Sequence, residues 1–163
     1  MGQQGTLTRV WARKGSRPRA VRQTRYEYLY VLGAVCPASG QSVGLLAPYV
    51  NTKIVNEFLT RLAGAVSPDE QGVVLWDQAG YHRSGTLEVP ANLSLIALPP
   101  YSPELNPMEN GWHYHRSHYW ANQAYADYEA LEQRACQSWQ AIHSDVQLVR
   151  SIYHAPYLTA ATL

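Results

Sequence analysis

The alternation of apolar and polar residues marks the first half of the chain as a series of strands. Residues 6–12, 26–35 and 41–50 alternate as strands do. The turn-forming residues Pro-Ala-Ser-Gly at 37–40 separate the second strand from the third. The pattern therefore predicts an antiparallel hairpin, preceded by one further strand at 6–12.

A different pattern follows the hairpin. Residues 72–77 and 92–100 are short continuous apolar runs, which are typical of buried parallel strands. Apolar residues three and four positions apart predict helices at 51–64, 128–142 and 146–152. Together these elements predict an α/β fold, with a mixed sheet flanked by helices. Because the sequence shows no internal repeat or linker, we expect a single domain over residues 1–163.

The charged residues are distributed unevenly, although the formal net charge is only +1. Seven cations precede the first acidic residue, Glu27: Arg9, Arg13, Lys14, Arg17, Arg19, Arg22 and Arg25. A basic run of this kind favours contact with the phosphates of a nucleic acid. A solvated loop between two strands is the alternative and needs no partner.

The composition excludes several classes of protein. The 163 residues are 46% hydrophobic, which is enough for a globular core. No apolar run approaches the eighteen residues of a membrane span, so we expect no membrane partner and a cytoplasmic location. Two cysteines, Cys36 and Cys136, are too few for a disulfide framework, and we expect both to be buried thiols.

Two carboxylates stand where parallel strands and their loops place functional groups. Asp77 closes the apolar run 72–77, and ligands of α/β sheets bind at the carboxyl ends of the strands. Glu109 follows Asn106, a good N-cap, and Pro107, which suits the first helical position. Simpler roles remain open, because Asp77 can cap a following helix and Glu109 can complete a capping box with Asn106.

The segments that carry these carboxylates also carry longer motifs. They read DQAGYHRS at 77–84 and LPPYSPELNPMENGW at 98–112, and a third segment reads VWARKGSRP at 10–18. In these motifs the chain resembles the DDE superfamily of transposases, specifically the bacterial insertion-sequence group related to the mariner elements. The resemblance covers most of the chain, and the proline-rich motif is the most specific part of it.

This resemblance implies a ribonuclease H-like fold with a site of three carboxylates that holds two Mg²⁺ or Mn²⁺ ions. It assigns catalysis and metal binding to Asp77 and Glu109, and supporting roles to His82 and Asn106. The stiff proline loop and the Asn-Pro start of the helix are expected to hold Glu109 toward Asp77. The implied reaction is cleavage and strand transfer of DNA at insertion-sequence ends, with element ends and target DNA as partners. The implied location is the bacterial nucleoid within the cytoplasm.

The sequence departs from the family pattern at its beginning. The family's first strand ends in an Asp, but no acidic residue precedes Glu27, which is a poor substitute because it opens the hairpin. We therefore expect a domain without its first strand that is inactive alone. A truncated remnant that only binds DNA or regulates a transposase is the alternative. Without the first strand, its place in the sheet would be left open. We expect that residues 6–12 take this place, that the chain self-associates, or that it binds a transposase fragment encoded upstream.

Histidines cluster in the segment WHYHRSHYW at 112–120. His115 and His118 are one helical turn apart, which raises the alternative of a zinc site, but no cysteine or further acid completes a ligand set. The spacing of Trp112, His115 and Tyr119 favours aromatic packing along one helix face instead.

Overall fold

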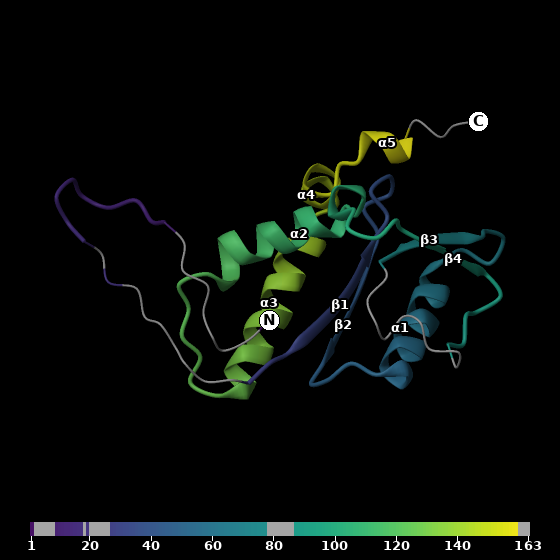
Figure 1. Ribbon diagram of the computed structural model, residues 1–163, viewed down its shortest axis with the longest axis horizontal. Coiled ribbons are helices and arrows are strands. Elements are labelled where there is room, and N and C mark those ends of the chain that lie inside the picture. Colours follow the sequence, from purple (N-terminus) through teal and green to yellow (C-terminus); the bar gives the residue numbers. More distant parts are fainter. Residues whose placement is uncertain (2–8, 18, 20–26, 78–86, 160–163) are drawn as a thin grey trace.

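The computed structural model describes residues 1, 9–17, 19, 27–77 and 87–159 (Figure 1). The strands are β1 (Tyr30–Val35), β2 (Ser42–Ala47), β3 (Gly72–Trp76) and β4 (Leu93–Ala97). The helices are α1 (Thr52–Ala65), the 3-10 turn η2 (Pro103–Leu105), α2 (Met108–His115), the π-helical turn η3 (Arg116–Trp120), α3 (Tyr128–His143), α4 (Val146–Ile152) and α5 (Pro156–Thr159). The order of these elements is that of an α/β protein.

Strands β1 and β2 form the predicted antiparallel hairpin, with Tyr30 opposite Ala47 and Val35 opposite Ser42. The turn closes where the Cys36 N–H donates to the Gln41 carbonyl at 2.8 Å. Gly40 has a φ of +77°, a left-handed conformation that glycine adopts without a steric penalty. The predicted turn at 37–40 is therefore confirmed.

Helix α1 supplies the core on which both pairs of strands rest. Its N-cap is Asn51, whose side-chain oxygen accepts from the Ile54 N–H at 3.0 Å. The buried face of the helix consists of Val55, Phe58, Leu59 and Leu62. Residues of all four strands pack against this face, including Leu32, Ala34, Val43, Leu45, Val74, Trp76 and Leu95. One helix thus holds the two sheets together.

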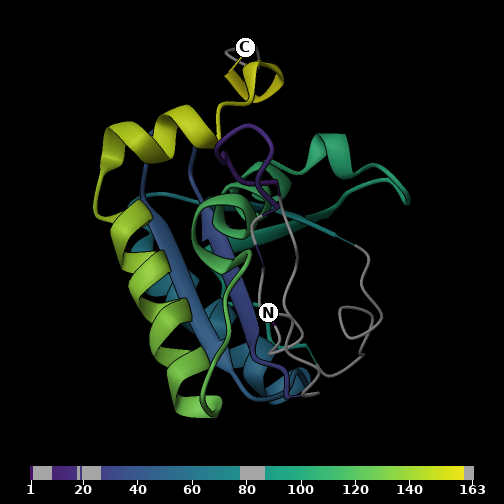
Figure 2. The same ribbon diagram turned by 90° about the vertical axis from the view of Figure 1, so that its left-hand side faces the viewer.

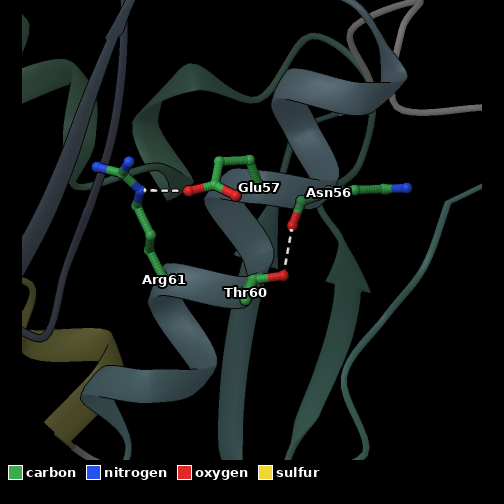
Figure 3. A network of polar contacts seen from close by, with 4 residues as sticks. All are labelled: Asn56, Glu57, Thr60 and Arg61. Carbon is green, nitrogen blue, oxygen red and sulfur yellow. Dashed lines mark hydrogen bonds and ion pairs between the residues drawn. The ribbon is translucent and has the colours of Figure 1, made fainter.

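The opposite face of α1 is polar (Figure 3). Arg61 and Glu57 form an ion pair at 2.8 Å with half-exposed side chains, and Thr60 donates its hydroxyl to the Asn56 carbonyl at 3.0 Å. The Asn56 side-chain oxygen accepts from the Glu88 N–H at 3.1 Å. Because pairs at this spacing contribute only a few tenths of a kcal/mol (roughly 0.2–0.5), the polar face mainly keeps the helix solvated.

Strands β3 and β4 form a parallel pair, with Gly72 opposite Leu93 and Trp76 opposite Ala97. The pairing continues one step further, because the Leu98 N–H donates to the Trp76 carbonyl at 2.8 Å. Both strands therefore end at the same edge, where Asp77 follows β3 and the proline loop follows β4.

Helix α3 covers the hairpin on the other side, as Figure 2 shows. Its buried residues are Leu131, Ala135, Ser138 and Ile142. The ring of Trp139 lies so close to Gly33 of β1 and Gly44 of β2 that an added Cβ at either glycine would meet it within 3 Å. Small residues on the hairpin therefore let the indole approach the strands closely.

The structure corrects four predictions. Residues 9–12, the described part of the strand predicted at 6–12, have no regular structure, and Trp11 is fully exposed. An alternating pattern forms a strand only where a neighbouring strand pairs with it, and none of the described strands does. The expected mixed sheet is present in the described part of the chain as two separate sheets, β1-β2 and β3-β4. Helix α1 continues through Gly64 to Ala65, and both Cys36 and Cys136 are exposed rather than buried.

Within the described ranges, no helix has the length and apolar character that crossing a membrane requires.

Candidate active site

The first candidate residue, Asp77, directly follows β3 and is exposed. Strand β3 carries it to the edge that β4 also reaches, and this edge is where α/β sheets bind ligands. The residues after Asp77, from 78 to 86, lie outside the described part. A helix that Asp77 could cap, and His82 with its predicted supporting role, would both lie among these residues, outside the described part.

The loop after β4 is stiffened by its prolines. Pro99, Pro100 and Pro103 fix the backbone on both sides of Tyr101, which has a φ of +59° and a fully exposed side chain. A left-handed backbone at a tyrosine is uncommon and costs free energy on the order of 1 kcal/mol. The sequence gives no signal of this conformation, because proline pairs occur with many loop shapes.

Asn106 and Glu109 are positioned by the start of α2. The Asn106 side-chain oxygen accepts from the Met108 N–H at 3.1 Å, and its backbone carbonyl accepts from the Glu109 N–H at 3.0 Å. The helix begins at Met108, one residue later than the sequence predicts. The Asn106 N–H donates to the Pro103 carbonyl at 3.0 Å. In a capping box the Glu109 side chain would accept from the Asn106 N–H. Because the Pro103 carbonyl accepts from that N–H instead, the Glu109 carboxylate is not needed there.

The three predicted residues meet in one pocket of about 410 Å³. Its lining is Asp77, Leu98, Pro99, Pro100, Tyr101, Ser102, Pro103, Asn106 and Glu109. The carboxylates of Asp77 and Glu109 thus come from the end of β3 and the start of α2, and the proline loop forms the wall between them. The pocket combines two carboxylates and an amide with a rim of apolar rings.

Helix α2 is anchored close to the pocket. Met108 is buried with Val149 and Tyr153, and the Tyr153 ring packs directly against Gly111. Because Glu109 lies between Met108 and Gly111 in the same helix, these contacts fix the direction from which its side chain enters the pocket.

The donor set of the pocket fits a hard divalent cation. Carboxylate and amide oxygens suit Mg²⁺ and Mn²⁺, and Mg²⁺ is often bound by one or two carboxylates, with water or phosphate completing its shell. Asp77 and Glu109 supply this minimum, although the described residues contain no group of three His, Cys, Asp or Glu side chains placed to share an ion.

The basic segment stands apart from the pocket. Arg9, Arg13, Lys14, Arg17 and Arg19 are all exposed, whereas Arg22 and Arg25 lie outside the described residues. Ser16 closes a turn by donating its N–H and its hydroxyl to the Arg13 carbonyl at 2.9 and 2.7 Å. In Figure 1 this segment, drawn in purple, projects away from the strands. The exposed cations are therefore accessible to a large polyanion.

The histidine segment forms a packed aromatic cluster. His115 is completely buried and stacks on Trp120 and Trp139, with ring centroids 4.7 and 5.9 Å apart. Trp112 lies 6.0 Å from it. The predicted aromatic packing of His115 is confirmed.

Sequence reasoning missed the second histidine of this cluster. His143 stacks on Trp139 at 3.7 Å, and its Nε2 lies 2.9 Å from the Tyr153 hydroxyl. Its Nδ1 lies 2.9 Å from the Trp139 carbonyl, which can only accept, so Nδ1 carries the proton and Tyr153 donates to Nε2. The spacing of Trp139 and His143, four residues apart on a helix, was the available signal.

Both histidines are held in the neutral form. Burial, followed by the repulsion between the two rings if His143 were also protonated, lowers the pKa of His115 from 6.5 to about 4. Burial also lowers the pKa of His143, despite its bond to the Trp139 carbonyl. Neither ring nitrogen of His115 has a hydrogen-bond partner among the described residues.

Comparison with known proteins gives three findings. The family model described as DDE superfamily endonuclease matches residues 1–132. An uncharacterized protein of Sinorhizobium fredii, y4pE/y4sA, is 37% identical over 125 residues, which are 77% of this chain and 93% of that protein. The crystal structure of the Mos1 strand transfer complex contains a chain with a similar fold, at a TM-score of 0.59 and 15% identity.

The structural match covers 92% of this chain but 46% of the Mos1 chain, so the present sequence spans less than half of that protein. At this identity the likeness establishes the fold, and the predicted ribonuclease H-like architecture is confirmed.

Proposed function

The chain belongs to the DDE superfamily of endonucleases, and on that basis we propose that it is the catalytic domain of a DNA transposase. Its reaction is metal-dependent cleavage and transfer of DNA strands at the ends of an insertion sequence, carried out at the bacterial nucleoid. The observation that carries this proposal is the pocket shared by Asp77 and Glu109.

Asp77 and Glu109 would hold the divalent ions of the family site. When bound, Mg²⁺ or Mn²⁺ neutralises charge on the phosphate and activates the attacking oxygen. The chain's own contribution is positional. Asn106 sets the first turn of α2 through its bond to Met108, and the proline loop keeps the wall of the pocket fixed. We assign His82 a supporting role near the phosphate.

DNA binding is the second part of the proposal. The exposed cations between Arg9 and Arg19, continued in sequence by Arg22 and Arg25, would contact phosphates of element ends or target DNA. Phosphate contacts position the duplex without reading its sequence. The segment therefore accounts for affinity, and it leaves the choice of element ends to other contacts.

A DNA-binding remnant is the second candidate function. It is favoured by the sequence between Met1 and Glu27, which contains many cations and no acid that could act as the third carboxylate. We therefore propose that these 163 residues by themselves cleave DNA slowly or not at all. Loss of a principal catalytic group typically costs several orders of magnitude in rate (about 10⁴ or more).

Binding of Mn²⁺ tests the metal site without requiring cleavage. Electron paramagnetic resonance of free Mn²⁺ should show one binding event that Asp77→Asn and Glu109→Gln each weaken strongly. Glu104→Gln is the matched control, because Glu104 lies in the same loop but does not line the pocket. Equal Mn²⁺ binding by the Glu109→Gln and Glu104→Gln variants would show that the pocket is not the metal site.

Nicking of supercoiled plasmid in Mg²⁺ or Mn²⁺ separates the two candidate functions. A catalytic domain should recover nicking when a strand that ends in Asp is fused ahead of Met1, and Asp77→Asn in that fusion should abolish the nicking. A remnant that only binds DNA should stay inactive in both forms.

A further inference from the structure

Tyr101 has an unfavourable backbone conformation that no packing of its side chain offsets. Its φ of +59° is left-handed, a conformation that residues other than glycine, asparagine and aspartate rarely adopt. Its side chain is 102% exposed, so the phenol ring is not stabilised by burial. Of the large hydrophobic residues that the structure describes, only Trp11 is equally exposed. Backbone strain of this kind is concentrated at sites that bind or convert a ligand.

The loop that carries Tyr101 is anchored on both sides. Before it, the buried residue Leu98 donates its N–H to the Trp76 carbonyl at 2.8 Å. After it, the turn η2 is closed where the Leu105 N–H donates to the Ser102 carbonyl at 3.1 Å. The prolines of the loop remove much of the remaining backbone freedom. Because the loop is already ordered, a ligand that binds to the ring would lose little affinity to ordering it further.

The pocket beside Tyr101 is lined by two kinds of surface. The carboxylates of Asp77 and Glu109 suit a phosphate that is bound through a cation. Leu98 and the proline rings form an apolar surface, and Tyr101 belongs to the same lining. A ligand that matches both surfaces has an anionic phosphate joined to a flat ring, as a nucleotide does. Its base has to be unpaired, because a paired base stays stacked inside the duplex.

Stacking is the interaction that an exposed tyrosine ring offers to such a base. It accepts any of the four bases, since each base has a flat π-face. The exposed cations between Arg9 and Arg19 contact phosphates, which paired and unpaired strands share. The ring of Tyr101 therefore adds a preference for unpaired nucleotides that the basic segment does not have.

We propose that Tyr101 stacks on an unpaired base next to the phosphate at Asp77 and Glu109, and so positions the DNA strand in the pocket. This rests on the proposed function, because it takes the reacting phosphate to lie at the two carboxylates. Tyr101 is a positioning residue: its ring fixes the base and thereby the phosphate attached to it. The pocket thus selects a strand with at least one unpaired nucleotide over an intact duplex.

Binding of two short DNA duplexes tests the proposal with the whole chain. Each duplex carries a single unpaired nucleotide at one 3′ end, a thymidine in one probe and an abasic residue in the other. In Mg²⁺ the chain should bind the thymidine probe about fivefold more tightly or better, because stacking of one base on an aromatic ring contributes at least this factor. Fluorescence anisotropy measures both affinities.

Tyr101→Asn removes the ring and keeps the backbone, because asparagine tolerates the left-handed conformation. This variant should unfold at about the same urea concentration as the original chain and bind the two probes equally. Tyr101→Phe keeps the ring and should retain the preference. Tyr49→Asn is the matched control and should also retain it, because Tyr49 is exposed but lies outside the lining of the pocket.

A photochemical probe locates the unpaired base. With 5-iodouracil in place of the unpaired thymine, irradiation should cross-link the DNA to Tyr101, which mass spectrometry of the digested chain identifies. A cross-link to Trp11, the other fully exposed ring, would overturn the proposal. Because this measurement uses the unaltered chain, it decides the matter even if Tyr101→Asn fails to fold.

Equal affinity of the original chain for the two probes would also overturn the proposal, as would a preference that Tyr101→Asn retains. Both results are distinguishable from a failure of the proposed function, which Mn²⁺ binding decides. Mn²⁺ bound at Asp77 and Glu109, with equal affinity for the two probes, would keep the catalytic site and remove the role of Tyr101. A preference that depends on Tyr101, in a chain that binds no Mn²⁺, would support the stacking and remove the catalytic site.

Discussion

Gly111 of α2 lies directly against the phenol ring and hydroxyl of Tyr153, with no room for a side chain between them. Tyr153 is itself fully buried and donates its hydroxyl to His143. The helix that carries Glu109 is therefore fixed by a contact two residues away from the carboxylate. The position of Glu109 depends on packing as well as on the start of its helix.

Replacing Gly111 with alanine should lower the free energy of unfolding by about 1–3 kcal/mol, because the new Cβ overlaps the buried ring. Urea denaturation measures the change. Gly64→Ala is the matched control in α1, where an added Cβ meets nothing within 4 Å. That substitution should stabilise the protein by roughly 0.5–1 kcal/mol. A Gly111→Ala variant as stable as the original chain would contradict the close packing.

Acid should destabilise the protein through His115. Its pKa is about 4 in the folded chain and 6.5 as the ordinary value, so the unfolded state binds the proton more readily. The stability contributed by neutral His115 is complete above pH 6.5 and is lost as the pH falls toward 4. Unfolding in urea at pH 5 should require up to about 2 kcal/mol less than at pH 7.

The variant His115→Phe isolates this effect. It keeps an aromatic ring in the stack and loses no hydrogen bond to the described residues, so its stability should depend less on pH. His113→Gln, at an exposed position in the same helix, should keep the full dependence. If His115→Phe also retains the full pH dependence of stability, another group is responsible for it, and His143 is the first candidate.

Asn106→Asp should strengthen divalent binding. Aspartate caps helices about as well as asparagine, so the bond from the Met108 N–H is retained and α2 should remain in place. The substitution adds a carboxylate to a pocket that already contains Asp77 and Glu109. Mn²⁺ affinity, measured by calorimetry, should rise several-fold. Unchanged affinity, with the fold intact by circular dichroism, would mean that residue 106 does not reach the ion.

Neutralising the basic segment should flatten the salt dependence of DNA binding. Changing Arg13, Arg17 and Arg19 to glutamine should reduce the slope of log K against log salt by up to about 3 for duplex DNA. Fluorescence anisotropy over a salt series measures this slope. A control variant with Lys53, Arg61 and Arg150 changed to glutamine carries the same charge change elsewhere and should keep the original slope.

Much of the fold could be predicted because local signals and packing agree. The turn at 37–40, the cap at Asn51 and the apolar face of α1 each specify the element that forms. The strand predicted at 6–12 was wrong for its described part because a strand requires a neighbour, and sequence alternation does not supply one. Exposure of Cys36 and Cys136 was missed for a similar reason, since burial of a small thiol depends on the surrounding surface.

The candidate site was predicted from motif and position, and the structure brings Asp77, Asn106 and Glu109 to one pocket. Their catalytic and metal-binding roles stay predictions, as does the role of His82. The left-handed backbone of Tyr101 and the pairing of Met1 with Leu29 could not be predicted. The pairing of Met1 with Leu29 depends on a contact between segments that are distant in the sequence. The conformation of Tyr101 is one that the neighbouring prolines permit but do not specify.

The packing of Trp112, Trp120 and Trp139 around His115 gives the molecule an optical reporter of its own. A protonated imidazole quenches the emission of an indole in contact with it, whereas a neutral imidazole quenches it much less. Three of the five tryptophans therefore report the charge on His115, and Trp139 also reports the charge on His143, on which it stacks at 3.7 Å. Their fluorescence should stay constant near neutral pH and decrease only at acidic pH, where the buried imidazole becomes protonated. A single titration of tryptophan emission therefore reports protonation in the interior of the protein without an added label.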